Sequence, residues 1–436
     1  MLSARSIDRA RRSLPRSACF ERVRIMDWRI GWVPLAALLA AQTAQAQSVG
    51  YEDALAAARG EQPVLEAGAL RVQSRREAAE AADELPDPRV RGGIMNLPVT
   101  GSAAFELDQQ LPTQVAIGVE QEIPNLARRR ARFGVASSEV RLAEARLGMA
   151  EREVLADAGT AWVRLHYAQA RLDLARAALV ELRAFVPVAN SAVASGSARP
   201  AESLAIRREL LGIEDAATSI EAERETAQAQ ISRYMPIENP VALGAPPSVS
   251  LDPEQLRFEL TSNPELLLAD AESRRAEAGI DLARAEKRPD FGVSVTYGRR
   301  NPDFGDAVSV MGSITLPIFT DRRQNPRIAA AEADAAAALA EREDRLRALR
   351  ARFEADLASW RSAARQWERA RDELLPLARD RADLETASFA AGRADLVDVI
   401  AAKAALVLLE LEILGREQAA VEAAATLRLT YGEDRP

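Results

Sequence analysis

The chain contains very few of the residues that bind metals or form disulfides. Its 436 residues include one cysteine, Cys19, one histidine, His166, and six methionines. A single cysteine can form neither an internal disulfide nor a cysteine-rich metal site. His166 lies beside Trp162 and Leu165 in a helical pattern, where a packed histidine is commoner than a ligand. We therefore expect no metal site and no cofactor.

Aromatic residues are also scarce, at 5% of the chain. No nucleophile–base set and no glycine-rich phosphate loop is recognisable, so we expect no catalytic residues and no enzyme activity.

The formal net charge of -8 argues against a nucleic-acid partner. Alanine, leucine, arginine and glutamate dominate instead, which is the composition of long helices.

The N-terminal segment 1–46 is typical of a secretory signal peptide. A basic stretch precedes the apolar run 30–41, and Ala44-Gln45-Ala46 places small residues before a cleavage site. The apolar run is too short to cross a bilayer as a helix. Met26 is an alternative start to Met1. We expect an exported chain that loses Cys19 on processing.

The remaining sequence indicates an internal duplication. Residues 193–207 read VASGSARPAESLAIR and residues 389–403 read FAAGRADLVDVIAAK, with Gly196 matching Gly392. Both copies have the pattern of a helix, a tight glycine turn and a second helix. The predicted first repeat spans 47–250, with strands near 89–98 and 113–123 and a helical hairpin at 126–233. The predicted second repeat spans 251–436, with strands near 290–299 and 307–317 and a helical hairpin at 321–431.

The long helical stretches carry apolar residues at coiled-coil spacing. Leu165, Leu172, Leu179 and Val186 recur every seven residues. Pro376 interrupts the corresponding stretch of the second repeat and predicts a kink there.

The four strand segments alternate in polarity. Val115, Ile117 and Val119 share one face of their strand, and Val293 and Val295 share one face of another. The opposite faces hold small or polar residues. Their length and alternation are typical of transmembrane β-strands, although a soluble hairpin packed on helices has the same pattern. Four strands cannot close a barrel, and an open edge is not stable in lipid, so a membrane-spanning version must take strands from several copies.

Four stretches together resemble the TolC-like outer membrane efflux proteins, especially the heavy-metal (cobalt-zinc-cadmium/copper) branch. They read PDPRVRGGIMNLP (86–98), VEQEIPNLARRRAR (119–132), LPIFTDRRQNPRIAAA (316–331) and AGRADLVDVIAAK (391–403). The resemblance implies a mainly α fold with transmembrane β-strands. Long helical hairpins would form a periplasmic α-barrel, and four strands per chain would contribute to a trimeric 12-stranded β-barrel.

The resemblance also implies a location and partners. The chain would lie in the outer membrane, in contact with its lipid, with most of its mass in the periplasm. The homotrimer would carry substrate, such as heavy-metal cations, from an inner-membrane proton-driven pump of the resistance-nodulation-division type and a periplasmic membrane-fusion adaptor.

Candidate site residues follow from the same resemblance. Gly196, Gly392 and Arg393 would mark the periplasmic tips that dock the adaptor. Asp398 would face the lumen as a gate, with Asp395 as a second candidate. The alternative for both acids is a solvated helix start with Asp395 as its N-cap.

Two other functions remain open at this stage. A soluble periplasmic coiled-coil adaptor or scaffold would need the helices but not four matched strands. A drug-efflux or protein-secretion duct of the same family would need both.

Overall fold

The structure is a computed structural model that describes residues 48–60, 62–107, 113–197 and 199–432. The predicted signal peptide, residues 1–46, lies outside these ranges. The first half contains β1 (Ser48–Val49), α1 (Tyr51–Arg59), α2 (Pro63–Asp83), β2 (Arg89–Met95), β3 (Gln114–Ile123), α3 (Leu126–Arg183), α4 (Phe185–Ala194), α5 (Pro200–Ser232) and β4 (Val241–Ala242). The second half contains α6 (Pro253–Glu259), η1 (Leu260–Ser262), α7 (Pro264–Ala285), β5 (Asp290–Arg299), η2 (Pro302–Phe304), β6 (Ala307–Thr315), α8 (Gln324–Arg369), the π-helical turn η3 (Ala370–Leu374), α9 (Leu375–Ala390) and α10 (Leu396–Tyr431).

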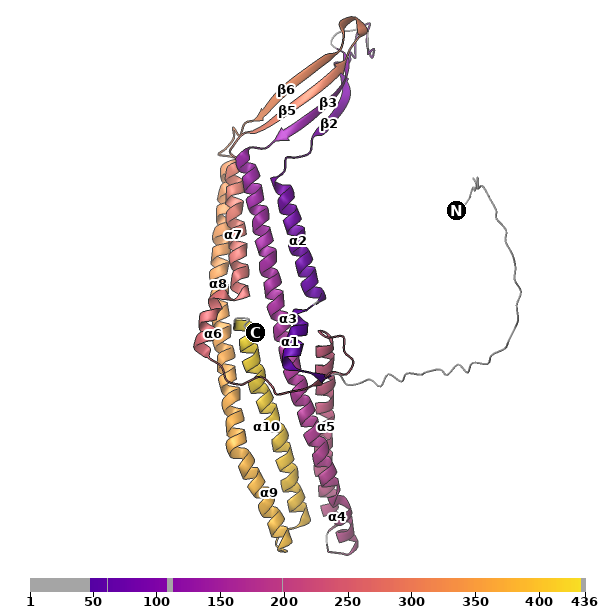
Figure 1. Cartoon of the computed structure of the whole chain (residues 1–436), viewed down its shortest axis with the longest axis vertical. Helices are drawn as coiled ribbons and strands as arrows, with labels where there is room; N and C mark the ends of the chain where they lie inside the picture. Colours follow the sequence, from indigo (N-terminus) through magenta and orange to yellow (C-terminus); the bar gives the residue numbers. More distant parts are fainter. Residues whose placement is uncertain (1–47, 61, 108–112, 198, 433–436) are drawn as a thin grey trace, which may run out of the picture. The chain divides into compact units, whose positions relative to one another are not determined.

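One antiparallel sheet takes two strands from each half. The strand order is β2-β3-β5-β6, so each half supplies a hairpin and the hairpins join through β3 and β5 (Figure 1). Val119 of β3 pairs with Val295 of β5. The mainly helical, duplicated chain with its four-stranded sheet confirms the expected fold class, and a single copy holds an open sheet rather than a barrel.

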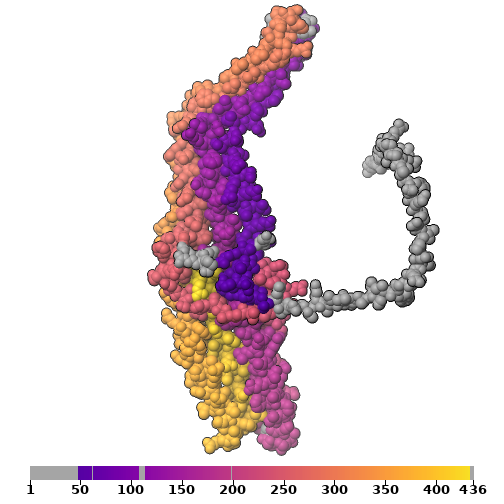
Figure 2. Space-filling view, viewed as in Figure 1, coloured from indigo at the N-terminus to yellow at the C-terminus, as the bar shows by residue number. Residues whose placement is uncertain are grey.

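The long helix α3 lies at the centre of the helical region. It contacts α2 and α7 beside the sheet, and α5 and α10 farther along. Leu165, Leu172 and Leu179 of the predicted seven-residue pattern are all buried. Leu172 packs with Ile220 of α5 and Leu411 of α10. In Figure 2, α10 (yellow) lies between α5 (magenta) and the α8–α9 segment (orange).

The duplication is also visible in side-chain hydrogen bonds that occur at equivalent places in the two halves. In each half a tryptophan donates to a valine carbonyl, a tyrosine donates to an aspartate, and an amide side chain donates to a carbonyl at the end of a helix. The first-half bonds are Trp162–Val49 at 2.8 Å, Tyr234–Asp157 at 3.2 Å and Gln62–Tyr234 at 2.9 Å. Their second-half counterparts are Trp360–Val249 at 3.0 Å, Tyr431–Asp356 at 2.6 Å and Asn263–Thr430 at 2.8 Å.

The helix of the second half changes its winding before Pro376. Residues Ala370–Leu374 form a π-helical turn, and Pro376 is the second residue of α9. Proline lacks an N–H and its ring crowds the carbonyl of the preceding turn. A wider turn relieves that crowding. The predicted disturbance at Pro376 is therefore a π-helical turn.

Sequence reasoning missed the short parallel pair β1–β4. Ser48 pairs with Val241 and Val49 with Ala242. The pair packs against α3 through the buried Val49, whose carbonyl accepts a hydrogen bond from Trp162, and through the partly buried Ala242. It ties the start of the described chain to the segment that connects the two halves.

Candidate functional site: the sheet, its junction with the helices, and the two tips

The sheet has one face rich in valine. Val90, Val119, Val295 and Val310 occupy one row across all four strands. Their exposed fractions are 70%, 48%, 46% and 69%, in that order. Apolar side chains aligned at one depth are what a strand needs where it faces lipid.

The opposite face carries charged pairs near the helical end. Arg91 of β2 approaches Glu120 of β3 at 2.5 Å, and Arg89 approaches Glu122 at 3.9 Å. Charges on this face balance one another between two neighbouring strands. The two faces therefore differ in the way expected of strands that separate lipid from a water-filled lumen.

Both outer edges of the sheet are open. Across the described ranges, no strand pairs with the free edges of β2 and β6. A backbone N–H or C=O group without a hydrogen-bond partner is strongly unfavourable in hydrocarbon. Burying each such group there costs on the order of several kcal/mol. This sheet is compatible with a membrane only when another chain covers both edges.

A hydrogen-bond network connects the sheet to the helices. The backbone N–H and the side-chain amide of Asn125 both donate to Asp290 Oδ1 at 2.8 Å. The Asn125 side chain also caps α3 by accepting from the Arg128 N–H at 2.8 Å. Arg128 completes the network with a 2.5 Å ion pair to Asp290 Oδ2. Sequence reasoning missed this network. Asn125 follows β3 and Asp290 is the first residue of β5, and each comes directly after a proline, in IPN and RPD.

The first tip is the turn between α4 and α5. Gly196 has φ +76°, the left-handed conformation that favours glycine. Its N–H donates to the Val193 carbonyl, and the Ser197 N–H donates to Ala192 at 3.0 Å. This is the Schellman arrangement that ends a helix.

The second tip, between α9 and α10, has the same geometry. Gly392 has φ +69°, and the Arg393 N–H donates to the Ser388 carbonyl at 2.9 Å. Gly196 and Gly392 therefore stand where the sequence pattern put the turns. Arg393 is exposed beside the second one.

The two tips differ in charge after the glycine. Asp395 is the N-cap residue of α10, and its backbone N–H donates to the Asp398 carboxylate at 3.2 Å. The corresponding first-tip residues are Arg199 and Glu202, which form a 2.9 Å hydrogen-bonded ion pair. Asp395 and Asp398 are both exposed, and Asp398 stabilises the start of its own helix.

Charge also links the tips to each other. The hydrogen bond from Arg199 lowers the pKa of the Glu202 carboxyl below its ordinary value. In return, Glu202 raises the pKa of Arg199, and the charge of Asp395 on the second tip adds a smaller effect in the same direction. Sequence reasoning did not single out Arg199, although its partner Glu202 lies only three residues further along the chain.

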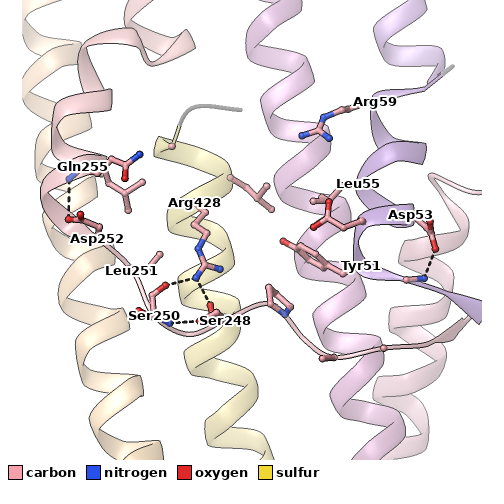
Figure 3. Close-up of a pocket in the computed structure, with 18 of the residues that line it drawn as sticks. Tyr51, Asp53, Leu55, Arg59, Ser248, Ser250, Leu251, Asp252, Gln255 and Arg428 are labelled. Carbon is pink, nitrogen blue, oxygen red and sulfur yellow. Dashed lines mark hydrogen bonds between the residues drawn. The ribbon is translucent and has the colours of Figure 1, made fainter. Parts of the chain in front are cut away.

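A cavity of about 810 Å³ lies between α1, the β4–α6 connection and α10. Figure 3 shows Arg428 reaching across it from α10, where it donates to the carbonyls of Ser248 and Ser250, each at 2.5 Å. Burial lowers the pKa of Arg428 and raises that of Tyr51, nearby, to about 12. These two bonds hold the connecting segment against α10, which is a structural role.

The described residues show no grouping suited to a metal ion. No three His, Cys, Asp or Glu side chains lie together in the described ranges. His166 stacks on Trp162 with ring centroids 5.2 Å apart, and burial lowers its pKa. His166 therefore packs as part of the helical core.

Part of the second half of the chain matches a known protein family. Residues 257–433 match the family model described as outer membrane efflux protein. No curated protein sequence matches the chain.

Solved structures extend the likeness to both halves. CusC, studied for folding and transmembrane channel formation, has a TM-score of 0.74 at 15% identity, over 88% of this chain and 92% of that one. A membrane protein from Pseudomonas aeruginosa has a TM-score of 0.74 at 18% identity, over 88% and 90%. The open state of the Neisseria gonorrhoeae MtrE outer membrane channel has a TM-score of 0.70 at 16% identity, over 88% of each chain.

The likeness to the solved structures shows that the chain has the fold of outer membrane channels, and residues 257–433 match the outer membrane efflux protein model. Both findings support the expected location in the outer membrane, with a large periplasmic helical part, and the expectation of a channel rather than an enzyme. They support an efflux channel and leave its substrate unspecified.

Proposed function

We propose that three copies of this chain form the outer membrane duct of a tripartite efflux system. The open-edged sheet with its row of valines carries this proposal. Three copies of four strands make twelve, an even number compatible with an open pore. The edge strand β2 of each copy would pair with β6 of the next, so that every backbone group is satisfied.

The helical tips are the proposed docking sites. Gly196, Gly392 and Arg393 are exposed at turns that face away from the sheet end of the helices (Figure 1). A periplasmic adaptor would contact these turns and connect them to a proton-driven pump in the inner membrane. The matched turn geometry supports one kind of contact repeated around the trimer.

Asp398, with Asp395, is the proposed gate. Three copies of an exposed carboxylate around a narrow opening would repel one another and attract cations. The Asp395 N–H donates to one carboxylate oxygen of Asp398, and the other oxygen would face the lumen in the proposed trimer.

Heavy-metal cations are the proposed substrates, on the strength of the stretches 86–98, 119–132 and 316–331. The runner-up substrate is an organic drug carried by the same duct. Deleting the gene and measuring tolerance to zinc, cadmium, copper and a set of dyes separates the two. Loss of tolerance to dyes alone would reject the metal assignment.

The duct itself is tested by location and mass. The mature protein should fractionate with the outer membrane and give the mass of a trimer by light scattering in mild detergent. A soluble periplasmic monomer or dimer would reject the duct and favour a coiled-coil adaptor or scaffold.

A further inference from the structure

The two halves leave the sheet in different ways. In the first half, β3 ends at Ile123 and α3 begins at Leu126. In the second half, β6 ends at Thr315 and α8 begins only at Gln324. The longer connection, residues 316–323 (LPIFTDRR), is called the junction loop below.

The junction loop presents apolar side chains to solvent. Leu316, Ile318 and Phe319 are exposed by 56%, 73% and 73%. The loop is nevertheless ordered by its own bonds, because the Arg322 and Arg323 N–H groups both donate to the Phe319 carbonyl. These bonds order the backbone of the loop at Phe319, whose side chain is exposed. The apolar row of β6, which ends in Ile314, continues directly into this loop.

A small basic pocket lies beside these apolar side chains. It has a volume of about 180 Å³ and is lined by Arg128, Arg288, Arg323 and Arg327, with Glu286 and Asp290 as counter-charges. Arg128 pairs with Asp290 and Arg327 pairs with Glu286 at 2.8 Å. Among the described residues, neither Arg288 nor Arg323 has a side-chain ion pair, so the pocket keeps two uncompensated positive charges.

The pocket also has an unsatisfied hydrogen-bond donor. Arg128 Nε is buried and has no hydrogen-bond partner within the described part of the chain. Buried polar groups normally find partners, so a site that leaves a donor open next to two free guanidinium groups fits an anion.

We propose that this pocket binds the phosphate headgroup of an anionic phospholipid of the periplasmic leaflet. The inference rests on the proposed function, since it requires the sheet to span the outer membrane. Arg288 and Arg323 would hold the phosphate, and Ile318 and Phe319 would contact the acyl chains. The pocket is at the helical end of the strands, which places it at the leaflet that faces the periplasm.

The test measures lipid binding to the full-length protein purified in mild detergent. Native mass spectrometry counts bound phosphatidylglycerol and, separately, zwitterionic phosphatidylethanolamine at equal concentration. We expect several-fold more phosphatidylglycerol. The double variant Arg288→Gln/Arg323→Gln should lower its binding to the phosphatidylethanolamine level. The control Arg365→Gln/Arg381→Gln removes two exposed arginines from α8 and α9 and should bind as the unmodified protein does.

Three results would overturn the proposal. Equal binding of both lipids, or equal loss in the control variant, would show that general charge explains the signal. Competition by soluble glycerol phosphate would identify a free-phosphate site instead. Dissociation of the oligomer by Arg288→Gln/Arg323→Gln in lipid-free detergent would assign the loop to a contact between copies.

The proposed duct can fail independently of this site. Its failure would appear as absence from the outer membrane fraction. Failure of the lipid site would leave location and particle mass unchanged and remove only the preference for phosphatidylglycerol.

Discussion

The two halves of the chain use the same frame and differ where each helix meets a proline. In the first half, α3 ends at Arg183, and the Ala184 N–H donates to Glu181 three residues back, shortly before Pro187. In the second half, the chain widens into the π-helical turn Ala370–Leu374 before Pro376. The helix winds more tightly before Pro187 in the first half and more widely before Pro376 in the second half.

The comparison shows which features the duplicated frame requires. The matched tryptophan, tyrosine and amide hydrogen bonds are kept in both halves, and so are the two glycine turns. The tip charges, the winding before each proline and the connection from sheet to helix are different. The features that both halves share stabilise the fold. The features that differ lie at the sites for which we propose a function, the tips and the junction of sheet and helices. The predictions below use substitutions at equivalent positions.

The largest effect is expected on the valine face of the sheet. Val119→Arg and Val295→Arg occupy paired positions from the two halves, and each should destabilise the membrane-inserted sheet by about 2–4 kcal/mol per chain. Outer membrane yield should fall equally for both. The control Thr296→Arg, on the opposite face, should assemble. Normal assembly of Val295→Arg would show that this face does not contact lipid.

The matched tryptophans should differ in their effect on stability. Trp162 is fully buried, whereas Trp360 is half-buried. We expect Trp162→Ala to cost about 3–5 kcal/mol, as large core truncations do, and Trp360→Ala clearly less. Urea unfolding followed by tryptophan fluorescence measures both. Equal midpoints would mean that the halves are equally packed.

The tip glycines should behave alike in folding and differently in transport. A valine at Gly196 or Gly392 would be forced into the left-handed region, at a cost of roughly 1–2 kcal/mol. Trimers should persist in both variants, and Gly392→Val should cut export. Gly212→Ala, inside α5 where an added Cβ meets open space, is the control. Unchanged export in Gly392→Val would remove that turn from the docking site.

Substitutions of the acidic residues at the two tips should show whether Asp398 acts in a gate or only stabilises the start of α10. Asp398→Asn should lower cation selectivity in single-channel recordings, because it removes one carboxylate per copy from the proposed gate. Glu202→Gln, its first-tip counterpart, should leave selectivity unchanged, since Glu202 is neutralised by Arg199. Identical recordings for both variants would leave Asp398 only its role at the start of α10.

The smallest effect is the pH dependence of the first tip. The Arg199 hydrogen bond lowers the pKa of Glu202, so the pair stabilises the tip above the ordinary glutamate pKa and loses that contribution as pH falls through the lowered value. NMR titration of the Glu202 carboxyl should show a midpoint below the ordinary value. Arg199→Gln should return it to that value, and an unshifted midpoint in the unmodified protein would contradict the pairing.

The sequence predicted those features that depend on local pattern. Alternation predicts strands around Val119 and Val295, and glycine between helical runs predicts the turns at Gly196 and Gly392. The residues that join distant segments could not be predicted in this way. Asn125 and Asp290 meet although they lie 165 residues apart, and the β1–β4 pair forms only because α3 covers it. Such contacts depend on the packed fold, which no local window contains.

The most direct test of the account is a cross-link between β2 and β6 of neighbouring copies. Cys19 is the only native cysteine, so in a Cys19→Ser background only the introduced cysteines can form disulfide cross-links. Gly92→Cys on β2, which has space for a Cβ, would be combined in turn with Val308→Cys, Val310→Cys or Gly312→Cys on β6. The account predicts that one of these pairs, on oxidation in isolated outer membranes, gives a covalent trimer as the largest product. Failure of every pair to link copies, with the protein present in the membrane, would contradict the shared barrel.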